Sequence, residues 1–206
     1  MFSLIKNDLH TNILACGDGP SSFNAEVHSN GGTVTSIDPI YQFTKGQINK
    51  KIKEVTPNIL EQVKQSSNNF VWKNIKSLED LKNIRLSAMD EFLNDYENGL
   101  KDQRYIEASL PILPFKDQQF DLVLCSHFLF LYDSFLSLDF HIQSIIEMCR
   151  IGKEVRIFPL VTLNGNTSKY ISDLQGALRN DYQIDIQTVD YEFQKDAKQM
   201  MKITKA

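Results

Sequence analysis

Two features of this sequence have the residue types and the spacing of a chemical site: a glycine turn and a carboxylate that follows it along the chain. The apolar run Ile13–Cys16 ends in Gly17-Asp18-Gly19, and Asp38 ends a second predicted strand, Thr33–Ile37, about 20 residues further on. Glycine lets the backbone pass close to a ligand, because no Cβ stands in the way. A carboxylate at this spacing can accept hydrogen bonds from both hydroxyls of a ribose. The pattern predicts a nucleoside-binding site, whose candidate residues are Gly17, Asp18, Gly19, Pro20, Asp38 and Pro39.

A histidine follows the clearest predicted strand of the chain. Residues 120–125, FDLVLC, are nearly all apolar, which is typical of a central parallel strand. Ser126 and His127 are expected just past its end, at the edge where open α/β sheets bind ligands. His127 could be a general base for a hydroxyl or an amine, hold a ligand through its backbone, or be structural. Tyr132 and Asp133 follow on the same loop and could reach a second substrate.

The elements that must position these residues alternate between strand and helix. Strands are predicted at residues 12–16, 33–38, 104–107, 120–125 and 154–158, and a C-terminal hairpin at 183–191 and 199–204. Helices are predicted at 20–29, 47–66, 77–96, 138–150 and 168–178. Pro20 is placed in the first turn of its helix, and Asn98-Gly99 is placed as a helix stop. The order predicts an α/β fold: a doubly wound, mostly parallel seven-stranded sheet with one reversed strand.

The segment from about residue 44 to 101 is much longer than one crossover connection needs. It is predicted to be a helical insertion within a single domain of residues 1–206. This insertion is expected to close over the edge of the sheet at which ligands bind. Its aromatic stretch, Asn69–Trp72, could line a substrate pocket or dock the helices on the sheet. Tyr41 and Phe43 could flank a nucleobase or pack under the insertion.

Composition and charge narrow the class of protein. The 206 residues carry a net charge of −4 from 22 basic and 26 acidic side chains, which gives no reason to expect a nucleic-acid partner. No apolar run is long enough for a transmembrane helix, and no secretory segment precedes the first strand. Cys16, Cys125 and Cys149 have no metal-ligand spacing and are expected to be buried thiols, so a cytoplasmic protein without a metal site is predicted.

Several segments in this order resemble a known family. They are Gly17-Asp18-Gly19, Asp38, the run from Leu113-Pro114-Phe115 to His127, and Glu147–Arg150 followed by Glu154–Ile157. Together with the terminal hairpin, they are similar to the motifs of the class I S-adenosylmethionine-dependent methyltransferases. The resemblance covers most of the chain outside the insertion.

The resemblance implies a Rossmann-like methyltransferase fold, S-adenosylmethionine as cofactor, and methyl transfer to an unidentified acceptor, expected to be a small molecule. It adds Ala108, Ser109, Ser126 and His127 to the cofactor-binding residues. Glu107 and Ser109 are rival candidates for the contact to adenine. In-line displacement from a sulfonium needs mainly positioning and exclusion of water, so no metal is required. The acceptor and the oligomeric state are left open.

The chain departs from the family pattern at the first strand. Ala15 stands where the family usually has an acid, and Ser21 stands where it has a third glycine. Asp18 could take the acid's place and hold the ammonium group of the cofactor. Two rival hypotheses remain: an NAD(P)-dependent Rossmann oxidoreductase, for which a third glycine is missing at Ser22, and a non-catalytic protein that binds S-adenosylmethionine.

Overall fold

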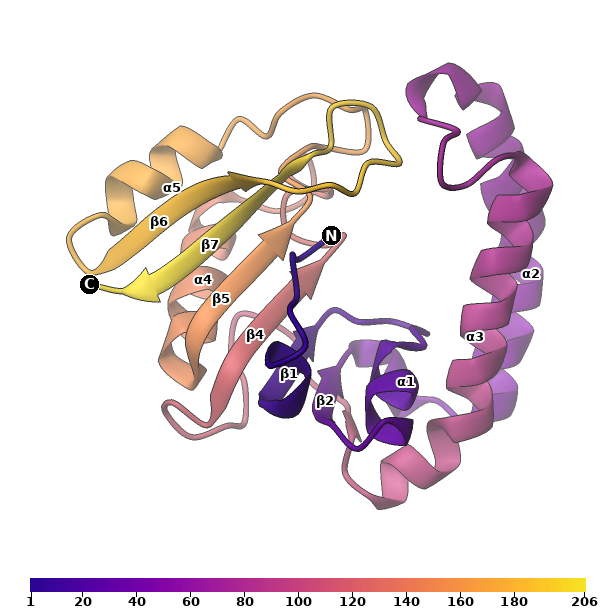
Figure 1. Cartoon of the computed structure of the whole chain (residues 1–206), viewed down its shortest axis with the longest axis horizontal. Coiled ribbons are helices and arrows are strands. Elements are labelled where there is room, and N and C mark those ends of the chain that lie inside the picture. The colour runs from indigo at the N-terminus through magenta and orange to yellow at the C-terminus, as the bar shows by residue number, and fades with distance from the viewer.

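The chain folds around one seven-stranded sheet. The computed structural model describes all 206 residues (Figure 1). The strand order is β3-β2-β1-β4-β5-β7-β6, and β7 alone runs against the others. The strands are β1 (Asn12–Cys16), β2 (Thr33–Ile37), β3 (Tyr105–Ile106), β4 (Phe120–Ser126), β5 (Gly152–Phe158), β6 (Tyr182–Thr188) and β7 (Gln199–Lys205). The predicted α/β class, strand number and reversed C-terminal hairpin are therefore confirmed.

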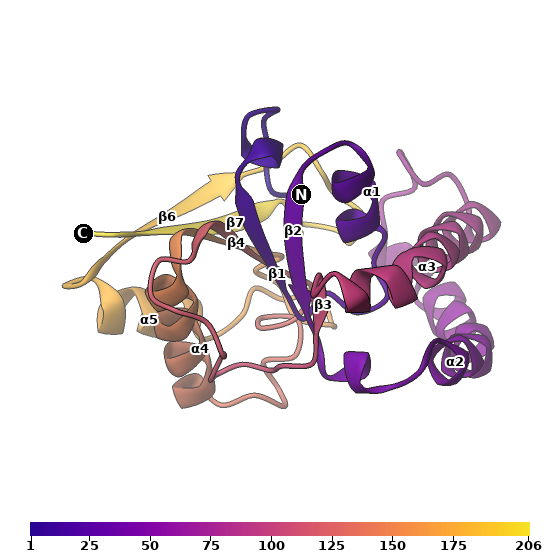
Figure 2. The same cartoon turned by 90° about the horizontal axis from the view of Figure 1, so that it is seen from below.

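Helices cover both faces of this sheet (Figure 2). They are α1 (Phe23–Ser29), α2 (Lys45–Gln65), α3 (Leu78–Lys101), α4 (Leu138–Ile151) and α5 (Ile171–Leu178). Alternate residues of β1 face opposite layers, as a strand requires. Leu14 and Cys16 pack in the cluster under α4 and α5, and Ile13 and Ala15 pack with α1 and the N-terminal Phe2. No helix is both long and apolar enough to span a bilayer.

Three predicted helix boundaries are wrong. The last helix begins at Ile171, not at Ser168. The first helix begins at Phe23, not at Pro20, because the chain from Gly17 to Ser22 is held in a turn. Helix α3 does not stop at Asn98-Gly99 but continues to Lys101. Gly99 is a packing residue, since a Cβ there would overlap the Tyr105 ring.

The three central strands end at one level, which is what creates the site. Cys16 at the end of β1 is paired with Ile37 of β2 on one side and with Cys125 of β4 on the other. Asp38 and Ser126 each follow these paired residues directly. The glycine turn, Asp38 and the start of the loop after β4 therefore meet at one edge, where the strand order reverses direction from β1.

Helices α2 and α3 form an antiparallel pair whose base is fixed to the β3 edge of the sheet. Tyr41, Phe92, Tyr96 and Tyr105 stack against one another there, and the Tyr96 hydroxyl donates to the carbonyls of Tyr41 and Phe43, both at 2.9 Å. Tyr41 is therefore a core residue, whereas the Phe43 side chain is exposed.

The far end of this pair, which we call the tip, meets the loop between β6 and β7. The Val71 N–H donates to the Phe193 carbonyl at 2.7 Å, and the Lys195 N–H donates to the Asn69 carbonyl at 2.9 Å. Trp72 packs edge-on against Phe193 at 5.6 Å and docks the tip. With its base at β3 and its tip at this loop, the pair spans the carboxyl edge of the sheet (Figure 1).

A buried arginine just before β3 joins three elements, α1, α3 and β2, near the base of the pair. The Arg104 guanidinium donates to both carboxylate oxygens of Asp95 on α3, each at 2.7 Å, and to Asn24 Oδ1 on α1 at 2.7 Å. The Asn24 amide in turn donates to the Val34 carbonyl at 3.1 Å and to the Ser36 hydroxyl at 3.0 Å, both on β2. Arg104 is only 8% exposed, so these bonds replace most of its hydration.

Arg104→Met should therefore destabilise the fold by about 3 kcal/mol or more, because it leaves Asp95 and Asn24 without their buried partner. Urea unfolding measures the loss. Lys153→Met is the matched control, since Lys153 pairs with Asp121 but is 61% exposed, and it should cost less than about 1 kcal/mol. Equal effects of the two substitutions would contradict the anchoring role of Arg104.

Candidate ligand site at the carboxyl edge of the sheet

The glycine turn has the backbone geometry that its sequence predicts. Gly17 and Gly19 have φ angles of +61° and +58°, in the left-handed region that other residues rarely adopt. A Cβ on Gly17 would lie 3.2 Å from the Phe128 ring, so this glycine admits the loop after β4. A Cβ on Gly19 would meet no atom within 4 Å, so this side of the turn borders open space.

Asp38 ties this turn to β2. Its Oδ2 accepts a hydrogen bond from the Gly19 N–H at 3.0 Å, and its Oδ1 accepts one from the Ile40 N–H at 2.9 Å. The Tyr41 hydroxyl donates to the Gly19 carbonyl at 2.8 Å and holds the same residue from the other side. Each carboxylate oxygen keeps a lone pair for a further donor. Asp38 thus has a structural role that the sequence did not predict, and still has capacity for a ligand.

Beside this turn lies a cleft of about 250 Å³, which we call the turn cleft. It brings together six of the predicted residues, Gly17, Asp38, Pro39, Ala108, Ser109 and His127. Phe128 and Tyr132, which were not predicted as cofactor-binding residues, complete much of the wall. Ser109 lines this cleft and Glu107 does not, so the geometry favours Ser109 of the two rivals.

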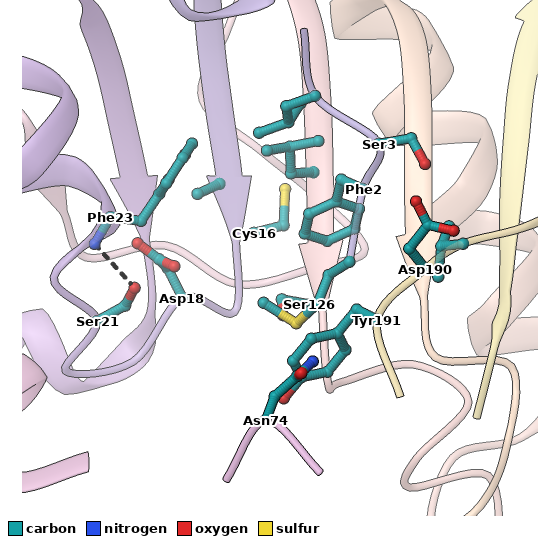
Figure 3. A pocket seen from close by; sticks show the side chains of 15 residues that line it. Phe2, Ser3, Cys16, Asp18, Ser21, Phe23, Asn74, Ser126, Asp190 and Tyr191 are labelled. Atoms are coloured by element: carbon teal, nitrogen blue, oxygen red, sulfur yellow. Dashed lines mark hydrogen bonds between the residues drawn. The ribbon is translucent and has the colours of Figure 1, made fainter. Parts of the chain in front are cut away.

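A second cleft, of about 590 Å³, lies on the other side of the turn (Figure 3). Asp18 and Ser21 line it from the turn, and Ser126 and Tyr191 line it from across. The N-terminal residues Met1–Leu4 form part of its wall, so we call it the N-terminal cleft. No sequence pattern indicated that this segment lies at the site. Pro20 lines none of the clefts described here.

Asp18 is a carboxylate without a cation in this cleft. The Ser36 hydroxyl donates to its Oδ2 at 2.6 Å, but no lysine, arginine or histidine pairs with it. Burial raises the pKa of Asp18 to about 6, although the Ser36 and Ser21 hydroxyls favour the ionised form; the nearby Asp38 adds to the rise. At neutral pH Asp18 is therefore an ionised, unpaired group that a cationic ligand would stabilise.

His127 lies at the centre of the edge, but Ser126 is the last residue of β4, not a residue beyond it. The His127 backbone has a φ of +51° and its N–H donates to the Phe158 carbonyl at 2.7 Å. The ring nitrogen Nδ1 lies 2.8 Å from the Ser126 hydroxyl. Burial and the Arg85 guanidinium lower the pKa of His127 to about 4, so the ring is neutral at physiological pH.

Tyr132 and Asp133, the other two candidate residues on this loop, lie in different surroundings. Tyr132 lines the turn cleft together with His127. Asp133 is buried, and its carboxylate accepts a hydrogen bond from the Ser168 hydroxyl at 2.8 Å. Asp133 therefore serves the packing of the loop, and the expectation that it reaches a substrate is wrong.

Comparisons with known proteins agree with this architecture. No protein-family model matches the chain. An uncharacterized protein of Methanocaldococcus jannaschii, MJ0045, is 34% identical over 202 residues, which cover 98% of this chain and 89% of that protein.

Two solved structures share the fold. The magnesium protoporphyrin IX methyltransferase of Synechocystis, solved with bound S-adenosylhomocysteine, has a TM-score of 0.51 at 12% identity, over 97% of this chain and 76% of the other. An S-adenosylmethionine-dependent methyltransferase of Methanosarcina mazei has a TM-score of 0.50 at 13% identity, over 100% of this chain and 97% of the other.

The raised pKa of Asp18 has a measurable consequence for stability. A carboxyl whose pKa is higher in the folded state binds its proton more tightly there, so stability falls as the pH rises from about 4 to above 6. Asp18→Asn removes this penalty and should stabilise the ligand-free protein by about 1–3 kcal/mol at pH 7.5, since one pKa unit corresponds to about 1.4 kcal/mol. Denaturant unfolding at pH 7.5 and pH 4 should show the gain only at the higher pH. Asp181→Asn, which removes a carboxylate at an exposed position, should show no gain in stability at either pH.

Proposed function

The chain belongs to the same family as the M. jannaschii protein and has the fold of the class I S-adenosylmethionine-dependent methyltransferases, and on this basis we propose that it is a methyltransferase. It binds S-adenosylmethionine at the carboxyl edge of the sheet and transfers the methyl group to a small-molecule acceptor.

The observation that carries this proposal is a pair of carboxylates at one glycine turn: Asp18 belongs to the turn, and Asp38 accepts a hydrogen bond from it. Asp38 borders the turn cleft and has lone pairs left for the two hydroxyls of a ribose. Asp18 borders the N-terminal cleft and has no cationic partner, which suits an ammonium group. A nucleoside joined to an amino acid carries two ribose hydroxyls towards one end and an ammonium group at the other. The glycine turn between the two carboxylates would lie along the middle of such a ligand.

The residues around the two clefts suit the uncharged parts of such a ligand as well as its ammonium group. Pro39, Ala108 and Ser109 form a small apolar and hydroxyl-bearing wall beside Asp38. Gly19 presents no side chain where the ligand would pass. These residues fit S-adenosylmethionine without a metal ion or a covalent nucleophile.

The protein's part in the chemistry is to position and desolvate the two reactants. S-adenosylmethionine supplies a methyl group on a positively charged sulfur, which makes it an activated donor. As the acceptor atom bonds to the methyl carbon, the carbon–sulfur bond breaks, and its electron pair stays on sulfur. A neutral His127, oriented through its hydrogen bond to Ser126, can take the proton that the acceptor loses.

Calorimetry with four ligands tests the proposal most directly. S-adenosylmethionine and S-adenosylhomocysteine should bind one-to-one, and NAD and NADP should not. Binding of NAD in preference to both would replace the methyltransferase with an oxidoreductase. Binding without methyl transfer to any acceptor in a broad screen would favour a non-catalytic protein.

Asp38→Ala should weaken the binding of S-adenosylmethionine about 10- to 100-fold, because hydrogen bonds to a charged group contribute about 1.5–3 kcal/mol. Asp181→Ala, which removes an exposed carboxylate at the start of the β6 hairpin, should leave the affinity unchanged. Because Asp38 also holds Gly19, circular dichroism must show that the variant is folded. Unchanged affinity in a folded Asp38→Ala protein would refute the ribose assignment.

His127→Asn should lower kcat while leaving S-adenosylhomocysteine affinity within a few-fold. Asparagine tolerates the positive φ at this position, so the loop should keep its shape. Because the pKa of His127 is about 4 and that of Asp18 is about 6, the acid limb of kcat/KM should lie near pH 6 and report Asp18. Full kcat in His127→Asn would leave positioning as the whole contribution of the protein.

A further inference from the structure

A third cleft, of about 470 Å³, lies beneath the tip of the helical pair, and we call it the tip cleft. The pair supplies one wall, and the loops that follow β5 and precede β7 supply the other. Its volume falls within the range of about 300–1,000 Å³ that is typical of small-molecule sites. The cleft is continuous with the candidate site, because His127 and Tyr132 line both the tip cleft and the turn cleft.

The lining of the tip cleft is largely apolar. Its larger side chains include Val63, Phe70, Leu131, Leu163, Tyr191 and Phe193. Aromatic rings on such a surface contribute much contact area and accept flat or apolar ligand bodies. The lining contains no aspartate and no glutamate. Nothing in this cleft would therefore repel a negative charge.

Arg85 of α3 is the one fully charged side chain in the tip cleft. Its guanidinium makes no hydrogen bond and no ion pair, whereas Arg104, Arg150 and Arg156 are all in ion pairs. Arg85 is exposed; desolvation lowers the pKa of its guanidinium, Tyr191 opposes that shift, and the group remains charged. An unpaired guanidinium in a largely apolar cleft without carboxylates is free to form two charge-assisted hydrogen bonds with an anionic ligand.

We propose that the tip cleft binds the methyl acceptor, and that the acceptor has an apolar or aromatic body and an anionic group that pairs with Arg85. This inference rests on the proposed methyltransferase function. The body of the acceptor lies among the aromatic side chains, its anion lies at Arg85, and its reacting atom is directed towards His127. The neutral state of His127 adds no second positive charge to compete for the anion.

Two fluorescent probes with the same ring system separate the charge from the apolar body. 1-Anilinonaphthalene-8-sulfonate carries a sulfonate, and N-phenyl-1-naphthylamine is the same molecule without it. The anionic probe should bind the wild-type protein one-to-one and at least about 10-fold more tightly than the neutral probe. Arg85→Gln should weaken the anionic probe about 10- to 100-fold and leave the neutral probe within about three-fold.

Arg179→Gln is the matched control. Arg179 follows α5 and, like Arg85, is exposed and unpaired, but it lies outside the tip cleft, so its loss should change neither probe. Arg85→Lys keeps the charge without the planar fork and should retain part of the preference for the anionic probe. Equal affinities of the two probes, or an anionic probe that Arg85→Gln leaves unchanged, would overturn the proposal.

Calorimetry with S-adenosylhomocysteine keeps this proposal separate from the function on which it rests. Arg85→Gln should bind S-adenosylhomocysteine as the wild type does, and the anionic probe and S-adenosylhomocysteine should bind together. Mutually exclusive binding would overturn the assignment of the tip cleft to the acceptor. Failure of the wild type to bind S-adenosylhomocysteine, with the probe results as expected, would refute the methyltransferase and with it the acceptor role, but not the anion preference.

Discussion

Charged groups held without partners at one edge of the sheet are the constraint on which the rest of this structure depends. Asp18 is removed from water without a cation, and Arg85 is exposed without an anion. The unpaired charge of Asp18 is unfavourable in the ligand-free protein. The surrounding fold must offset that cost, and it does so through strands whose residues are almost entirely buried, such as Ile13, Leu14 and Val123. Ligands that bring the opposite charges would relieve the cost, so binding at this edge and stability of the complex are coupled.

The helical pair over this edge is attached unequally at its two ends. At the base, four stacked aromatic rings and the buried Arg104 network hold it to the sheet. At the tip, two backbone hydrogen bonds and the packing of Phe70 and Trp72 on Phe193 hold it to the loop before β7. An element with fewer buried contacts opens at a lower free energy. The tip is therefore the end expected to open for a ligand, while the base keeps α3, and with it Arg85, in register with the sheet.

Local patterns predicted most of the sheet, because strands, glycine turns and hairpins are encoded by neighbouring residues. The central strand at 120–125 and the left-handed glycines Gly17 and Gly19 are examples. The failures involve partners distant in sequence. Pro20 looked like a helix start, but Asp38 and Tyr41 hold the turn before it. Gly99 looked like a helix stop, but its missing Cβ admits Tyr105. Neither Arg85 nor the N-terminal segment carries any local signal of the cleft that it lines, since both reach it only through the tertiary fold.

Ala15, which stands where the family usually has an acid, and Asp18 lie in different surroundings. Ala15 lies inside β1 and packs in the apolar cluster with Ile13 and Val34, where a carboxylate would have no hydrogen-bond donor among those side chains. Asp18 lies three residues later, beyond the end of the strand, where the Ser36 hydroxyl donates to it at 2.6 Å and Ser21 also favours its ionised form. Ser21, in place of a third glycine, adds a hydroxyl beside Asp18, and its oxygen also accepts the Phe23 N–H at 3.2 Å at the start of α1. The serine at this position thus favours the ionised form of Asp18, which a glycine could not do.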